Sequence, residues 1–367
     1  MSFFMGSPTF RRFHVSQIPK QVDSPEFLQN IKQNVFSPLK ESEEMSLGWV
    51  SISNLLDTTL SYEKIFKDRF LVLGFRIDKR RAPSLIFKAY LDLEQKELLK
   101  VKGTTRLTPE EQKQLKDRVK NRCSKEFPPG SQLYEIVWDF KKKNLYFSGS
   151  GNSICTEMSK LFYSTFSMEL IPLDPIGLIA LDIEQQKAIK KITPSYFVEH
   201  SSGIPRSDKD YLGSEFLTWL WCFSDQNSTL TLPSDQHLHL EMYDNLQLIS
   251  HSEEEKVTIH GVTGSAQEAS AALKQGKKLS SVQILIQKGE QEWLFTFKGK
   301  TFDFKTVKTP AVDDVEETDR FVSRMQYLEE VTEMIDQLYQ LFLKARLGSA
   351  WEKEEIPQIR RWILKNK

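Results

Sequence analysis

Residues 105–127, TRLTPEEQKQLKDRVKNRCSKEF, predict a long helix with little apolar surface. Thr108 suits the N-cap, Pro109 the first helical position, and Glu111 the reciprocal position of a capping box. The apolar residues recur every four positions and form a narrow stripe: Leu115, Val119, Cys123 and Phe127. A second helical stretch at 83–101 precedes this one, so the sequence predicts an α-helical hairpin with a thin internal interface.

Cations flank the apolar stripe on both sides. Lys113, Lys116 and Lys120 lie along one side, and the other side carries Arg118, Arg122 and Lys125. A helix with this surface covers little of a hydrophobic core.

The rest of the chain predicts an α+β fold, in which antiparallel sheets are covered by packed helices. Strands follow one another in neighbouring runs, without the regular alternation of a doubly wound fold. The expected strands are 9–15, 48–52, 69–81, a β-hairpin at 134–149, strands through 229–262 and a pair within 281–308. The expected helices begin at Ser24–Pro25 and continue with 153–168, 177–190, 265–275 and a C-terminal helical segment from about 314.

The prolines of ELIPLDP (169–175) suggest a domain boundary, and HSSGIPRSD (200–208) is expected to be irregular. The predicted organisation has five parts: 1–81 as the first part of an N-terminal α+β domain, 82–130 as a projecting helical hairpin (the finger), 131–175 as the remainder of the first domain, 176–312 as a second α+β domain, and 313–367 as a C-terminal helical segment.

The composition excludes a strong net electrostatic field around the protein as a whole. The 367 residues contain 50 Lys and Arg and 50 Asp and Glu, so any site for a polyanion has to be a local patch. The three cysteines are far apart and form no CxxC pair, which favours a reducing compartment. The N-terminus does not resemble a signal peptide, and the apolar runs are too short to span a bilayer. We therefore expect a cytoplasmic protein without a membrane partner.

Evidence for an enzyme is weak. HLHLEMY places His237, His239 and Glu241 on one face of an expected strand, where they could hold zinc or iron for a hydrolase or nuclease; a solvated strand face is the simpler interpretation. FSGSGNS (147–153) could cradle a phosphate but lacks the ending of a P-loop, which favours a plain turn and helix start. The sequence suggests no catalytic residue, cofactor or resident metal.

The C-terminal helical segment carries an apolar seam. Its residues recur at alternating three- and four-residue steps: Leu328, Val331, Ile335, Leu338 and Phe342. Such a short seam usually packs on its own domain. The alternative is that residues 314–345 form a docking surface of a protein-interaction module.

The order of several segments resembles the recombination-associated RdgC family. The similarity covers about residues 9–308, and no single motif in it is catalytic. The segments that carry it are LGWVSI (47–52), FLVLGFRIDKRRAPSLIFKAYL (70–91), RLTPEEQKQLKDRV (106–119), MELIPLDP (168–175), SAQEASAALKQGKKLSSVQILIQKGEQEWLFTF (265–297) and FKTVK (304–308).

The resemblance implies a non-enzymatic protein that forms a ring-shaped homodimer around double-stranded DNA, with little sequence preference, and that restrains a RecA-type recombinase in the nucleoid. It also implies that the finger tips of two subunits meet to close the ring, with Phe127 as the apolar contact at this gate. The DNA-facing candidates are Lys79, Arg80, Arg81, Arg106, Lys113, Lys116, Lys120, Lys277, Lys278, Lys305 and Lys308.

Overall fold

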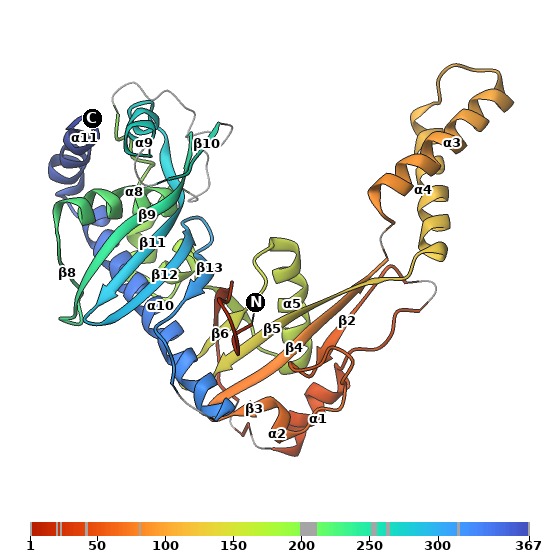
Figure 1. The fold of residues 1–367 in the computed structure, drawn as a ribbon, viewed down its shortest axis with the longest axis horizontal. Coiled ribbons are helices and arrows are strands. Elements are labelled where there is room, and N and C mark those ends of the chain that lie inside the picture. Colours follow the sequence, from red (N-terminus) through yellow and green to blue (C-terminus); the bar gives the residue numbers. More distant parts are fainter. Residues whose placement is uncertain are drawn as a thin grey trace.

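A computed structural model shows an α+β fold built on two antiparallel sheets, as the sequence predicts (Figure 1). It describes residues 2–19, 21–22, 24–40, 43–80, 82–198, 211–250, 255–261, 265–313 and 316–365. The segment 200–208 and Arg81, for which the sequence suggested an irregular stretch and a DNA contact, lie outside the described residues.

The first sheet has the strand order β2-β4-β5-β6-β1-β7, and a short β3 pairs with β4. Every pairing is antiparallel. The strands are β1 (Arg11–Val15), β2 (Met45–Val50), β3 (Phe66–Lys67), β4 (Phe70–Lys79), β5 (Gly130–Asp139), β6 (Asn144–Phe147) and β7 (Leu170–Pro172).

Side-chain alternation along β4 explains why the first sheet is covered on both faces. Leu71, Leu73 and Phe75 join a core with the helices α1 (Pro25–Gln33) and α5 (Asn152–Phe166). Phe70 and Val72 join a second core, together with side chains of the C-terminal helix α10 (Glu317–Leu347). Ser24 caps α1 as the sequence predicts, since its hydroxyl accepts a hydrogen bond from Phe27 N. A one-turn helix, α2 (Tyr62–Ile65), precedes β3.

The second sheet has the order β10-β9-β11-β12-β13, with β8 paired to β9. Its strands are β8 (Leu230–Thr231), β9 (His237–Ile249), β10 (Lys256–Ile259), β11 (Lys278–Lys288), β12 (Gln291–Lys298) and β13 (Asp303–Lys308). The sequence predicted two strands within 281–308, and the structure has three, because GKTF (299–302) forms a second tight turn and the chain returns as β13.

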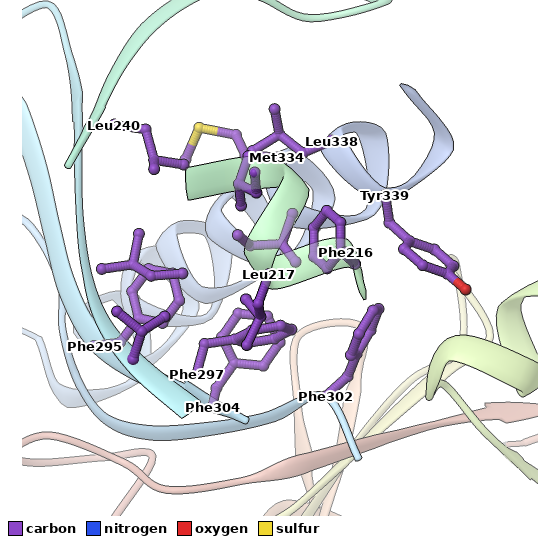
Figure 2. Close-up of a cluster of buried hydrophobic side chains, with 14 of the residues drawn as sticks. Phe216, Leu217, Leu240, Phe295, Phe297, Phe302, Phe304, Met334, Leu338 and Tyr339 are labelled. Carbon is purple, nitrogen blue, oxygen red and sulfur yellow. The ribbon is translucent and has the colours of Figure 1, made fainter. Parts of the chain in front are cut away.

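One face of the second sheet is a dense aromatic core against α8 (Tyr211–Gln226) and α10. Figure 2 shows Phe216 and Leu217 of α8 between the phenylalanines of β12 and β13 and the side chains of α10. The apolar seam predicted in the C-terminal segment is buried in this core. That confirms packing on its own chain and is incompatible with its use as a docking surface for a partner.

The two sheets share this core and are also joined by ion pairs. Phe10 next to β1 forms a β-bridge with Phe304 of β13, and their rings stack with centroids 5.2 Å apart. Arg11 of β1 pairs with Asp303 at 2.7 Å. The hydrophobic core continues across the predicted boundary near residue 175.

The finger is confirmed as a helical hairpin. It consists of α3 (Ser84–Lys102) and α4 (Pro109–Glu126), extends from the ends of β4 and β5, and projects away from both sheets (Figure 1). Both hydrogen bonds of the capping box between Thr108 and Glu111 are present. Gly103 ends α3 in the left-handed conformation, with a φ of 64°, which a glycine adopts without strain.

The remaining helices differ in part from the prediction. The single helix expected at 177–190 is two helices, α6 (Pro175–Ala180) and α7 (Ile183–Ile189), because the Asp182 side chain caps a new helix start. Helix α9 (Ser265–Lys274) agrees with the prediction. After α10 the predicted C-terminal helical segment continues as a π-helical turn at Trp351–Glu355 and then α11 (Ile356–Lys365), which the sequence analysis did not separate from the helix before them. None of the helices in the described part of the chain has the length and apolar character needed to cross a bilayer.

Candidate nucleic-acid interface

The finger has a thin core and a cationic surface. Leu115, Val119 and Cys123 are buried, whereas α3 has no buried residue. Segment 82–130 holds eleven Lys and Arg against seven Asp and Glu, a net charge of +4 in a chain whose total charge is zero. Because the hairpin projects from the body, most of these cations face solvent. The charge distribution therefore makes the finger the kind of local basic patch that polyanion binding requires.

Exposed cations of the finger differ in how they are paired. Lys120 forms an exposed ion pair with Glu44 at 2.7 Å. Within the described residues, Arg106, Lys113 and Lys116 form no ion pair, and all three are exposed. Arg106 lies in the turn at the tip, and the two lysines lie on the outer face of α4. These three side chains can approach a phosphate without first giving up a carboxylate.

Lys79 and Arg80 lie at the base of the finger, where β4 ends. Both are half-buried, and the Arg80 guanidinium donates a long hydrogen bond of 3.4 Å to the Lys40 carbonyl. The structure therefore places them close to the start of α3 and separate from the tip.

Phe127 also lies at the base of the finger. It is the C-cap of α4, half-buried, three residues before β5 begins. A contact between two finger tips would involve the turn at 103–107, at the other end of an 18-residue helix. The expectation that Phe127 is an apolar contact at a tip-to-tip gate is wrong for this geometry.

Lys277 and Lys278 are not surface cations. Lys278 is buried, donates to the Ser195 carbonyl at 2.6 Å and lies 3.1 Å from the Glu215 carboxylate. Lys277 is also buried along its length and pairs with Glu255 at 3.0 Å. Their assignment as DNA contacts is a misinterpretation, because neighbouring carboxylates and backbone oxygens already occupy their ammonium groups.

The last two strands bring the other predicted cations together. The face of β12 and β13 that points away from α8 carries Lys298 and Lys305, while Phe297 and Phe304 point into the core. Burial and the neighbouring Lys298 ammonium lower the pKa of Lys305. Lys308 lies three residues after Lys305 at the end of β13 and is exposed. Two close ammonium groups repel each other, so an anion between them would be stabilised.

A hollow of about 920 Å³ lies beside this cationic face, between β1, α5 and the turn that joins β12 to β13. Its lining is mixed: Arg11, Lys160 and Lys300 lie there together with the carboxylates of Glu169 and Asp174 and with apolar side chains such as Phe13 and Leu170. Sequence analysis noted the glycine-rich turn before α5, but it did not place this turn beside the turn between β12 and β13. The bridge between Phe10 and Phe304 and the contacts of Arg11 with Asp303 and Asn152 bring these distant segments together.

The alternative metal site is not formed. Both ring nitrogens of His239 are occupied, one by Glu241 at 2.8 Å and the other by the Ser228 carbonyl at 2.7 Å. His237 instead contacts the Thr231 hydroxyl at 3.0 Å. The hydrogen bond that His239 donates to the Glu241 carboxylate raises the pKa of His239, as in an ordinary surface pair. No group of three metal-ligating side chains occurs among the residues that the structure describes, so the His-x-His-x-Glu hypothesis is not supported.

No protein-family model matches the chain, and the curated proteins contain no significant match.

Proposed function

We propose that this protein binds double-stranded DNA without sequence preference, as a homodimer, and modulates RecA-type homologous recombination as a divergent member of the RdgC family. It performs this role without catalysing a reaction on the DNA. Binding to DNA would place it on the nucleoid.

The observation that carries the proposal is the placement of two cationic surfaces on one neutral chain. One surface is the finger, with Arg106, Lys113 and Lys116; the other is the open face of β12 and β13, with Lys298 and Lys305. Phosphate contacts from such rigid elements supply affinity that does not depend on sequence.

The proposal of a homodimer follows from where these surfaces lie. The finger and the second sheet stand at opposite ends of the molecule, with the first sheet and α10 between them (Figure 1). A second copy that joined finger to finger would extend the two surfaces into one continuous collar. Closure around a duplex would also slow dissociation, because release would require an interface to open.

Modulation of recombination would follow from occupancy of the duplex. A collar that covers double-stranded DNA competes with a recombinase filament for the same partner. A strand-exchange reaction with a RecA-type protein should therefore slow as this protein saturates the duplex, and the same duplex should be recovered uncut.

Fluorescence anisotropy with labelled duplexes of unrelated sequence tests the proposal. All duplexes should bind with similar affinity, and the logarithm of the binding constant should fall with the logarithm of salt by about 0.9 per phosphate contacted. The double variant Lys298→Glu/Lys305→Glu should lose at least about tenfold in affinity and flatten the salt slope, because two phosphate contacts are removed. Lys187→Glu, an exposed charge reversal on α7, is the matched control and should leave binding unchanged.

Two results would overturn the proposal. One is an absence of binding to any duplex at low salt. The other is equal loss of affinity in Lys187→Glu and in the double variant, which would mean that total charge, and not this surface, determines binding.

A further inference from the structure

A groove of about 470 Å³ lies at the end of the molecule opposite the finger, between α9, α11 and the chain at 197–198. Its lining consists of five apolar and three cationic residues. The apolar ones are Phe197, Val198, Pro357, Ile363 and Leu364, and the cationic ones are Lys274, Arg360 and Arg361. None of these described lining residues carries a carboxylate.

The amphipathic character of α11 creates the groove. Ile359, Trp362 and Ile363 point inward and are buried, which fixes the helix against the body. Leu364 remains 69% exposed at the rim, and Arg361 is exposed beside it. The Arg360 guanidinium donates to the Tyr196 carbonyl at 3.2 Å, which holds this cation at the edge of the apolar floor.

We propose that this groove binds an acidic peptide segment of a partner protein, in which one or two bulky apolar side chains are flanked by Asp or Glu. The argument is complementarity of charge and shape. A volume of about 470 Å³ lies in the range of ligand pockets and suits one or two large side chains. The three cations at its edge favour carboxylates and would steer an acidic segment toward the apolar floor.

The same geometry disfavours nucleic acid or a bilayer as the occupant. A duplex presents phosphates along a convex surface and has no side chain to fill an apolar depression. A bilayer would require several apolar side chains that protrude from the surface, whereas Leu364 is the one strongly exposed side chain among the five apolar lining residues. The inference does not depend on the proposed DNA-binding function, because the groove shares no residue with the finger or with β12 and β13.

A selection from a random octapeptide display library on the immobilised full chain tests the proposal. The enriched peptides should combine at least two Asp or Glu residues with Phe, Trp, Leu or Ile. Binding of a synthesised enriched peptide, measured by fluorescence anisotropy, should weaken with salt.

Variants then assign the binding to the groove. Arg361→Glu and Leu364→Asp should each weaken the peptide at least about tenfold, because one reverses a rim charge and the other removes an apolar contact. Both side chains are exposed, so folding should be unaffected, and circular dichroism checks this. Lys187→Glu is the control and should bind the peptide like the parent protein.

Three outcomes would overturn the inference: no enrichment of acidic peptides, enriched peptides whose affinity is the same for Arg361→Glu and the parent protein, or loss of duplex or anionic-vesicle binding in Arg361→Glu without any change in peptide binding.

Discussion

Glu215 and Lys278 form a buried ion pair, with Lys278 Nζ 3.1 Å from Glu215 Oε1. Arg346 reaches the other carboxylate oxygen at 2.8 Å. All three side chains are buried between α8, β11 and α10, so one anion serves two cations. Burial lowers the pKa of Lys278, which agrees with an ammonium that is costly to keep charged at this position.

The imbalance of this cluster predicts an asymmetry between two substitutions. Glu215→Gln leaves two buried cations without a counter-charge and should lower the free energy of unfolding by about 3–5 kcal/mol. Lys278→Met should cost much less, because Arg346 and Glu215 remain as a balanced pair. Urea unfolding at pH 7 measures both variants. A larger loss for Lys278→Met than for Glu215→Gln would contradict this account.

A second buried cluster predicts a pH dependence. Glu329 of α10 accepts hydrogen bonds from Arg69 at 2.5 and 2.6 Å and lies beside the buried Asp139 of β5. Burial and the hydrogen bond with Asp139 raise the pKa of Glu329 to about 7, against the opposing effects of Arg69 and Lys142. The folded state therefore binds a proton that the unfolded state releases near its ordinary pKa of 4.5.

The free energy of unfolding should therefore fall as pH rises from about 4.5 to 7, because the folded state binds more protons than the unfolded state in that range. Glu329→Gln cannot titrate, so its unfolding free energy should change less between pH 5 and pH 8 than that of the parent protein. Glu333→Gln, an exposed neighbour on α10 that contacts Lys142, is the control and should retain the parent pH dependence. An identical pH dependence in the parent protein and Glu329→Gln would refute the assignment.

The capping box of α4 predicts a local effect. The finger has little tertiary packing, so its helix start depends on the two hydrogen bonds between Thr108 and Glu111. Thr108→Ala should cost about 1 kcal/mol. Hydrogen exchange should show faster exchange in the first turns of α4 and unchanged exchange in both sheets. Thr105→Ala, outside the helix, should change neither region.

Features that depend on local sequence could be predicted, whereas features that depend on contacts between distant segments could not. The finger and its cap were predictable because period, N-cap and proline position are local signals that the isolated helix already obeys. Lys277 and Lys278 could not be distinguished from surface lysines, because α8 and its Glu215, about sixty residues earlier, determine their burial. The hollow beside β1 likewise depends on a bridge between residues 10 and 304.

Two local signals in the sequence could have improved the predicted helix boundaries. Asp182 is a typical N-cap, and it divides the expected helix at 177–190 into α6 and α7. In α11, Ile359, Trp362 and Ile363 have helical spacing, which could have distinguished a separate packed amphipathic helix within the predicted C-terminal helical segment. The identity of Lys298 and Lys305 as a close pair required the register of β12 against β13, which the sequence does not fix.

The uncovered apolar side chains of α3 predict where two fingers would meet. Leu93 is 59% exposed and Val101, one turn from the tip, is 85% exposed. Exposed apolar groups along a projecting helix are stabilised when a partner covers them. In the proposed homodimer, Val101→Asp should therefore weaken self-association at least about tenfold, because a carboxylate would be buried in the contact. Phe127→Ala, at the base of the finger, should leave the association constant unchanged. Sedimentation equilibrium measures both, and a monomeric parent protein, or a larger effect from Phe127→Ala, would show that the fingers do not join through this face of α3.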